Sequence, residues 1–545
     1  MSNIALPENE NKKRNELLHE RPLKIVFKTA LPLLFYSFLK TAFMFFDVLT
    51  VSKIDQSMVS TVLFVTDIQN ILDYVFVSMA IAVGIRISRS FGAGDFDEIK
   101  RDLSTVFFTF LFIGIAVASI SIPFVKPILS FFKIPDEMLD IGSTYFSFSI
   151  FGTIFAAINT LYFSSVKARG NTKVVSICNI LLLMTKPLFN LPIMHFINNG
   201  MLSRHSAVIL LPLSVCLSHF LITLIALREF FAKDSPFRIS WKHTSFNKEF
   251  FEPYIKLAIP IIMIKSMTTV SKVICNSQYA VYGSICLAAF SCCNRITSIV
   301  TTPLDAIQDA ETTVIAASMG GHQYGRVKKT IADSLLLMIA IVTALFIIVN
   351  LSAEALIGYF AGENLEMMDN IRRLYRIQRL DFIFMAFDSA FSAYLFAAKK
   401  TKLKTISSFL QKFVIRIPLL YVLTHYFRIG VEAIALSILI SNTMTSLFTV
   451  ASYFFVRGDL EAKTTVVDDP DNRLIDAVRA LGRLDAFDSQ TGYANGINIP
   501  EDILLIMKQR FNSDIEIEEL AQEYRYALVE ARIDELEKQE NIYAR

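Results

Sequence analysis

Charged side chains within apolar stretches are the residues of this sequence most able to do chemistry. Residues 25–51 are long and apolar enough to cross a bilayer, yet they include Lys40 and Asp47. An ionised carboxylate in hydrocarbon costs at least about 2.5–3.5 kcal/mol, so it normally pairs with a cation, faces a bundle interior, or marks an ion or substrate pathway. Asp47 is therefore a candidate for one of these roles.

Later apolar stretches carry further polar residues. Asp67, Asn70 and Tyr74 follow at i, i+3 and i+7, which places them on one face of a helix, and Lys265 and Lys272 stand two turns apart on another. The other candidates are Asp73, Arg295, Asp305, Asp309, Glu311, Asp381 and Arg416. Such groups predict a wet cavity with charges of both signs, which suits an anionic, zwitterionic or mixed substrate better than a purely cationic one. For each residue, an internal ion pair or a place at a helix end is the alternative.

The composition indicates which class of protein holds these charges. Of 545 residues, 53% are hydrophobic and 19% charged, and the mean hydropathy is +0.47, outside the range of ordinary soluble domains. Apolar runs of about 20 residues, long enough to cross a bilayer, begin near residues 25, 58, 103, 142, 174, 206, 256, 285, 331, 378, 405 and 431. The sequence thus predicts an all-α integral membrane protein with twelve transmembrane helices.

The distribution of basic residues predicts the orientation. Loops on the side of the amino terminus hold far more Lys and Arg than the opposite loops, so both termini are expected in the cytoplasm of a multi-pass cell-membrane protein. Residues 1–22 lack an apolar core followed by a small-residue cleavage site and are interpreted as a cytosolic arm. The six Cys show no metal-ligand spacing, and we expect no metal site.

Two landmarks recur after 228 residues. Lys28–Pro32 is echoed by Lys256–Pro260, and the glycine turn 90–100 is echoed by residues 318–328. Glycine at a helix end adopts left-handed dihedral angles without a side-chain penalty, so both turns predict tight elbows. Neither turn is a G-x-x-x-x-G-K-[ST] phosphate loop, so ATP-driven transport is not expected.

A third landmark repeats at nearly the same displacement. Gly170–Lys173 is echoed by Lys399–Lys402 after 229 residues, a shift that also aligns Asn159 with Asp388. Three such landmarks predict two parallel six-helix repeats, related by an axis along the membrane normal, with a cavity between them near the midplane.

These motifs carry a resemblance to a known family. The elbow SFGAGDFDEIKR, its copy MGGHQYGRVKK, the loop KARGNTK and the segment LAIP resemble, in order and spacing, the multidrug and toxic compound extrusion (MATE) family of the multidrug/oligosaccharidyl-lipid/polysaccharide flippase (MOP) superfamily. The resemblance covers about residues 22–456. It implies two six-helix lobes that form a V around a central cavity and export organic compounds against H+ or Na+.

The resemblance also implies roles for single residues. Asp47 resembles the acid of the first helix that binds the coupling cation, and Asp388 resembles the acid of the tenth helix. The fifth helix departs from the family, because Leu182 and Lys186 stand before Pro-Leu-Phe where many members have an Asn and then an Asp, and only Asn179 remains. In the seventh helix, Thr268 takes the position of an acid found in some bacterial members.

These departures bear on the coupling ion. A Na+ site requires several hard oxygen ligands, whereas here Lys186 could pair with Asp47 and occupy the place of the cation. Protonation of Asp47 would compete with that pair, so H+ is the expected coupling ion and Na+ the less favoured one. A static salt bridge is the alternative. No other cofactor is expected.

The expected function is secondary active antiport that exports small organic compounds by alternating access. The alternatives are a flippase for lipid-linked oligosaccharides or lipids, and a receptor or scaffold that does not transport. A membrane enzyme is not expected, because neither H-E-x-x-H nor G-x-S-x-G occurs. We expect a monomer that contacts the bilayer and a small organic substrate but no nucleic acid.

The predicted domains follow from these landmarks. They are a cytosolic arm (1–22), an amino-terminal lobe (23–228), a cytosolic linker (229–253), a carboxyl-terminal lobe (254–456) and an acidic cytosolic extension (457–545). The extension holds 11 Lys/Arg against 20 Asp/Glu, and its apolar spacing predicts a small helical module. A cytosolic partner for it is possible, and solvation of the chain end is the simpler alternative.

Overall fold

The computed structural model describes residues 8–51, 56–131, 136–199, 204–232, 235, 237–279, 282–362 and 364–468. Within these ranges the regular structure is entirely helical, and twelve helices or helix runs are long and apolar enough to cross a membrane. The predicted all-α class and the number of transmembrane helices are therefore confirmed. Met1–Phe455 forms one compact unit. The helices predicted after residue 468 lie outside the described residues.

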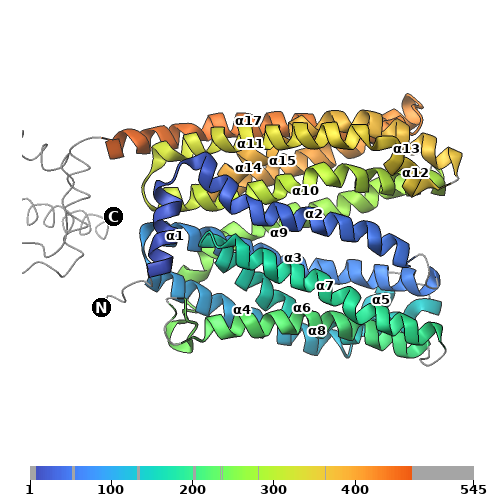
Figure 1. Ribbon diagram of the computed structural model, residues 1–545, viewed down its shortest axis with the longest axis horizontal. Coiled ribbons are helices and arrows are strands. Elements are labelled where there is room, and N and C mark those ends of the chain that lie inside the picture. Colours follow the sequence, from blue (N-terminus) through green and yellow to red (C-terminus); the bar gives the residue numbers. More distant parts are fainter. Residues whose placement is uncertain are drawn as a thin grey trace, which may run out of the picture. The chain divides into compact units, whose positions relative to one another are not determined.

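The first half of the chain supplies six of the twelve spans. Its helices are α1 (Glu8–His19), α2 (Pro22–Val51), α3 (Gln56–Ala93), α4 (Phe96–Ser121), α5 (Val125–Phe131), α6 (Asp136–Ala168), α7 (Thr172–Asn198) and α8 (Arg204–Phe230). Helices α2, α3, α4, α6, α7 and α8 contain the spans. We call α2–α8 the first lobe (Figure 1).

The second half supplies the other six spans and is here called the second lobe. Its elements are α9 (Lys248–Tyr279), α10 (Ser284–Gly320), α11 (Tyr324–Leu351), α12 (Ala353–Ala361), α13 (Leu365–Gln378), the 3-10 turn η3 (Arg379–Asp381), α14 (Phe382–Ala397), α15 (Thr401–Phe409), the π-helix η4 (Leu410–Arg416), α16 (Ile417–Tyr421), the π-helix η5 (Val422–Tyr426) and α17 (Glu432–Asp468). The tenth span joins α13 to α14, and the eleventh runs from α15 to η5.

The two halves repeat each other in backbone detail. Gly94 (φ 82°) corresponds to His322 (φ 57°), and Gly170 (φ 74°) to Lys399 (φ 61°). After each of these left-handed residues, the next backbone N–H donates to a carbonyl five residues earlier, at 2.8–3.1 Å. This is the Schellman way of ending a helix. The predicted repeats therefore share their elbows, although the second copy places residues other than glycine there.

Each repeat also fixes its entrance helix in the same way. The hydroxyl of Ser176 donates to the carbonyl of Pro32 at 2.6 Å, and that of Thr405 donates to the carbonyl of Pro260 at 3.1 Å. Helix α2 packs against α7 in its own lobe and also against α10 of the second lobe, while α9 packs against α15 and against α3 of the first lobe. The interface between the lobes is thus built from α2 and α3 on one side and α9 and α10 on the other.

At the end of the bundle that carries the elbows, here called the elbow end, the two lobes touch backbone to backbone. A Cβ atom placed on Gly92 would lie 2.1 Å from the carbonyl oxygen of Ala317, and one on Gly320 would lie 1.9 Å from that of Arg89. Arg89 also crosses the seam, since its Nη2 donates to the carbonyl of Ala397 at 2.8 Å. The lobes are therefore closed against each other at this end.

Helix α1 lies across that seam. Arg14 donates from Nε to the carbonyl of Phe91 at 3.0 Å and from Nη2 to that of Gly92 at 2.9 Å, both in the first lobe. On the second lobe, Arg326 Nη2 donates to the carbonyl of Leu17 at 3.0 Å, and Leu18 packs against Gly321. The predicted polar arm thus contains a helix whose two leucines are buried between the lobes.

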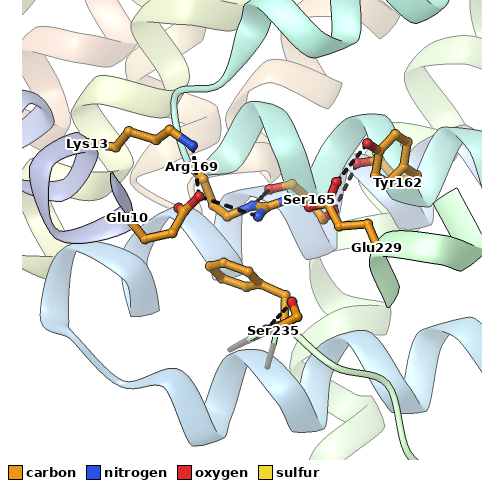
Figure 2. A network of polar contacts seen from close by, with 8 residues as sticks. Glu10, Lys13, Tyr162, Ser165, Arg169, Glu229 and Ser235 are labelled. Carbon is orange, nitrogen blue, oxygen red and sulfur yellow. Dashed lines mark hydrogen bonds and ion pairs between the residues drawn. The ribbon is translucent and has the colours of Figure 1, made fainter. Parts of the chain in front are cut away.

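A polar network ties α1 to the first lobe (Figure 2). Arg169, at the end of α6, donates from Nη2 to Glu229 at 2.6 Å and lies 4.0 Å from Glu10. Tyr162 donates to the other carboxylate oxygen of Glu229 at 2.8 Å, and Lys13 donates to Glu10 at 2.7 Å. Alternating charges therefore join α1, α6 and α8.

The left-handed elbows make a stability prediction. His322→Gly should raise the free energy of unfolding by about 1 kcal/mol, because the left-handed conformation costs a residue with a Cβ roughly this much free energy. Gly94→Ala should lower it by a similar amount. Gly358→Ala in α12 is the control: its backbone is right-handed and its surroundings are open, so helix propensity alone should raise stability. Chemical unfolding of the purified protein measures all three. A loss of stability in His322→Gly would contradict the prediction.

The seam predicts a local effect on opening. Gly92→Ala and Gly320→Ala should each force the lobes apart at the elbow end, since the new Cβ would overlap a backbone carbonyl. Amide hydrogen exchange should then become faster in residues 88–95 and 316–323 of both variants, whichever elbow is changed. Gly358→Ala serves as the control, and exchange that rises only at the mutated elbow would argue against a shared seam.

Candidate functional site

The second lobe contains a network of charged side chains drawn from four neighbouring segments. Asp381 ends η3, and Asp388 follows on α14 two helical turns later. Lys404 comes from α15, and Lys412 and Arg416 come from η4. The partners Asn442 and Thr449 lie on α17. Spacings of eight and four residues between the three cations keep them near one face of the eleventh span.

Asp388 is engaged by an ammonium group. Lys404 Nζ lies 2.7 Å from each of its two carboxylate oxygens, and the hydroxyl of Thr449 donates to Oδ1, also at 2.7 Å. Lys404 is buried, and the Asp388 side chain is 29% exposed. The pair therefore has one enclosed partner and one that water can reach.

A second chain of polar groups joins Asp381 to Arg416. Arg416 Nη2 donates to Asn442 Oδ1 at 2.6 Å, and its Nε donates to Ser441 at 2.9 Å. The amide nitrogen of Asn442 makes a short hydrogen bond to the carboxylate of Asp381. An amide thus bridges the guanidinium and the carboxylate, and Asp381 is buried at 4% exposure.

Lys412 lies between these two arrangements. Its ammonium donates to Gln411 Oε1 at 3.1 Å, and it interacts electrostatically with Arg416, Lys404 and Asp388. The side chain is 8% exposed. It lies within the π-helical segment, and π-helical turns are frequent at functional sites.

A second group of charges lies at the interface between the lobes. Asp305 on α10 interacts electrostatically with Asp309 on the same helix, with Lys265 on α9 and with Lys40 on α2. Asp309 also accepts a hydrogen bond from Lys167 of α6 at 2.7 Å. Asp305 and Lys40 are exposed although each belongs to a membrane span. Charges of both signs from the two lobes therefore lie near one another at this interface, and the predicted cavity stays a prediction.

Polar contacts also cross the interface between α3 and α9. The hydroxyl of Thr269 lies 3.4 Å from that of Tyr74. Asp73, next to Tyr74, is partly exposed. Thr268 is exposed and its hydroxyl bonds back to the carbonyl of Ile264 in its own helix. The predicted residue Thr268 is thus satisfied locally.

The repeat partner of Asp388 has a neutral version of the same contact. Asn159 is buried, its Oδ1 accepts a hydrogen bond from Thr223 at 3.0 Å, and its amide donates to the carbonyl of His219 at 2.9 Å. Thr223 lies on the sixth span of the first lobe, as Thr449 lies on the sixth span of the second. The two lobes therefore share the contact, but only the second lobe places a carboxylate in it.

Several predicted residues lie apart from both groups or outside the described part of the chain. Lys272 is exposed on α9, Arg295 is partly exposed on α10, and Asn179 is partly exposed on α7. The backbones of Asp47, Asp67, Asn70 and Lys186 are helical, but their side chains lie outside the described residues. The proposed Lys186–Asp47 pair therefore stays a prediction.

The sequence analysis missed Lys404, Lys412, Asn442 and Thr449. The apolar run predicted for the eleventh span begins near residue 405, whereas the span begins at Thr401 and includes Lys404, whose side chain is buried. Its spacing to Lys412 and Arg416, in multiples of four residues, was a signal that could have placed all three on one helical face. Asn442 and Thr449 carry no charge, and nothing in their spacing marked them.

Comparisons with known proteins identify the family of this chain. The family described as MatE matches residues 32–191 and 260–422, one segment in each lobe. The probable multidrug resistance protein YoeA of Bacillus subtilis is 22% identical over 71% of this chain and 84% of its own length. The multidrug export protein MepA of Staphylococcus haemolyticus is also 22% identical, over 80% of this chain and 94% of its own.

Solved structures share the fold. A crystal structure of a MATE protein in complex with MaL6 superposes with a TM-score of 0.75 at 16% identity, covering 83% of this chain and 99% of that one. A MOP superfamily transporter from Pyrococcus furiosus gives a TM-score of 0.73 at 16% identity, covering 82% and 98%. Because the MatE family matches more than half of the sequence, in two segments that coincide with the two lobes, this chain belongs to the MatE family of membrane transporters and is not an enzyme.

Proposed function

We propose that this protein exports drugs, toxins or other small organic compounds across the cell membrane, in exchange for H+, by alternating access. The names of its relatives YoeA and MepA support export of such compounds. The excess of basic residues near the elbow end supports a cytoplasmic location for that end, so both termini would be inside. Substrate would then enter when the seam between the lobes opens.

The Asp388–Lys404 pair is the observation that carries the proposal of proton coupling. An ammonium group occupies both carboxylate oxygens of Asp388, the position at which a coupling cation would otherwise sit. A proton can neutralise Asp388 and release Lys404, whereas Na+ would have to displace the ammonium and find further oxygen ligands. Such exchange of partners gives the lobe two discrete states, which coupling requires.

The seam supplies the second requirement of the mechanism. Opening at the elbow end must separate Gly92 from Ala317 and Gly320 from Arg89, and must break the contacts of α1 with one lobe. The interfacial charges on α2, α9 and α10 lie within these helices and take no part in the seam. A change of charge in the second lobe could therefore shift the balance between the two arrangements through α9, which packs against both α15 and α3.

Proteoliposomes test the function directly. Purified protein is reconstituted, a pH gradient or a Na+ gradient is imposed, and the uptake of a panel of cationic and anionic fluorescent dyes is followed. We expect movement of at least one dye class that depends on the pH gradient and stops when a protonophore collapses it. Transport driven by Na+ alone would overturn proton coupling, and no transport of any dye under either gradient would favour a receptor or scaffold.

Asp388 is predicted to be required for coupling. Asp388→Asn keeps the shape but cannot exchange a proton, so transport driven by the pH gradient should fall to the level of empty liposomes while expression and folding persist. The control is Glu354→Gln, which breaks an exposed ion pair with Arg372, at 2.7 Å, outside the network. Transport by Asp388→Asn equal to that of the control would remove this carboxylate from the mechanism.

Stability should reveal whether Asp388 and Lys404 act as a pair. Lys404→Met leaves a partly buried carboxylate without its cation, and Asp388→Asn leaves a buried ammonium without its anion, so each should lower the melting temperature. The double variant should lose less than the sum of the two, because neither charge is then left alone. Strictly additive losses would show that the pair contributes nothing beyond its separate members.

A further inference from the structure

The charges of the second-lobe network do not balance. Lys404 pairs with Asp388, and Arg416 is joined through Asn442 to Asp381. Each of the two carboxylates thereby has a polar partner, although Oδ1 of Asp381 is buried without a hydrogen bond. Among the described residues, the ammonium of Lys412 donates one hydrogen bond, to the neutral amide oxygen of Gln411.

The environment of Lys412 is unfavourable for an isolated cation. An ammonium group has three N–H donors, of which one is used here. Two like charges, Lys404 and Arg416, act on it against one opposite charge, Asp388, whose two oxygens already bind Lys404. Burial removes most of the water that would screen these charges. A buried charge of this kind is usually paired, because without a partner it loses several kcal/mol of solvation.

Partly exposed polar residues flank this position. Gln411 and Arg416, on either side of Lys412, are only partly buried, so the network has an accessible edge. Helix α9 packs against η4 and carries Lys265, which belongs to the charged group at the lobe interface. Basic residues thus lie on both of these packed segments.

We propose that the ammonium of Lys412 receives the anionic group of the transported compound, so that the substrates are organic anions or zwitterions with a carboxylate, phosphate or sulfonate. This deepens the function proposed above and rests on it. An arriving anion would supply the counter-charge that the network lacks and would bond to the two free donors of Lys412. Charge-assisted hydrogen bonds of this kind are roughly twice as strong as neutral ones. The competing explanation is an uncharged amine at Lys412, which would give no preference for anions.

Equilibrium binding tests this without any gradient. The full-length purified protein in detergent is titrated into carboxyfluorescein, an anionic dye, and into ethidium, a cationic one, and the fluorescence anisotropy is recorded. The wild type should bind carboxyfluorescein. Lys412→Met should weaken that binding about tenfold or more, equivalent to at least about 1.4 kcal/mol, and should leave ethidium unaffected or bound more tightly.

Two further variants keep the result interpretable. Lys412→Arg preserves the charge and should retain most of the preference for the anionic dye. Lys402→Met, an exposed cation on the same span, should change neither affinity. Lys412→Met should melt no lower than the wild type, because it removes one of three neighbouring cations and leaves Asp388 bound to Lys404, so a loss of anion binding would not be a loss of folding.

The outcomes separate this proposal from the proposed function. Anion binding that is lost in Lys412→Met supports the substrate class even if vesicle transport proves independent of the pH gradient. Transport that depends on the pH gradient but moves only ethidium, with carboxyfluorescein binding equal in the wild type and Lys412→Met, would overturn the substrate class and leave proton coupling standing.

Discussion

The contact between the two lobes at the elbow end is the constraint on which the rest of the structure depends. Backbone atoms of α3 and α10 approach so closely at Gly92 and Gly320 that no side chain fits at either position. Helices held this close at one end keep α2, α3, α9 and α10 in a single interface. The charged groups Lys40, Lys265 and Asp305 interact across that interface.

Much of the fold could be predicted from the sequence because its signals are local. A run of about 20 apolar residues is sufficient to identify a span, and a glycine turn marks its end without knowledge of what packs there. The repeat could be predicted for the same reason, because Lys28–Pro32 and Lys256–Pro260 are similar as short sequence segments. At His322 and Lys399 the second copy keeps the left-handed backbone of Gly94 and Gly170, although neither position is a glycine.

The candidate site was predicted less completely, because its partners come from distant segments. A carboxylate in an apolar stretch indicates that a partner exists, but it does not say which cation will meet it. Asp388 was identified through the family resemblance, whereas its partner Lys404 is sixteen residues away across a turn, and Thr449 is on another helix. The π-helix of η4, which changes the direction of Lys412 and Arg416, has no signal in composition or periodicity. The buried leucines of α1 were likewise hidden within a charged sequence.

Helix α1 has a practical consequence for work on the purified protein. It begins at Glu8 and contacts both lobes, through Arg14 on one side and the carbonyl of Leu17 on the other. A bulky fusion partner or a rigid affinity tag joined directly to the amino terminus would therefore pull on a segment that bridges the two lobes. An affinity tag at the carboxyl end, or one separated from Glu8 by a long flexible spacer, should not disturb the contacts of α1 with the two lobes.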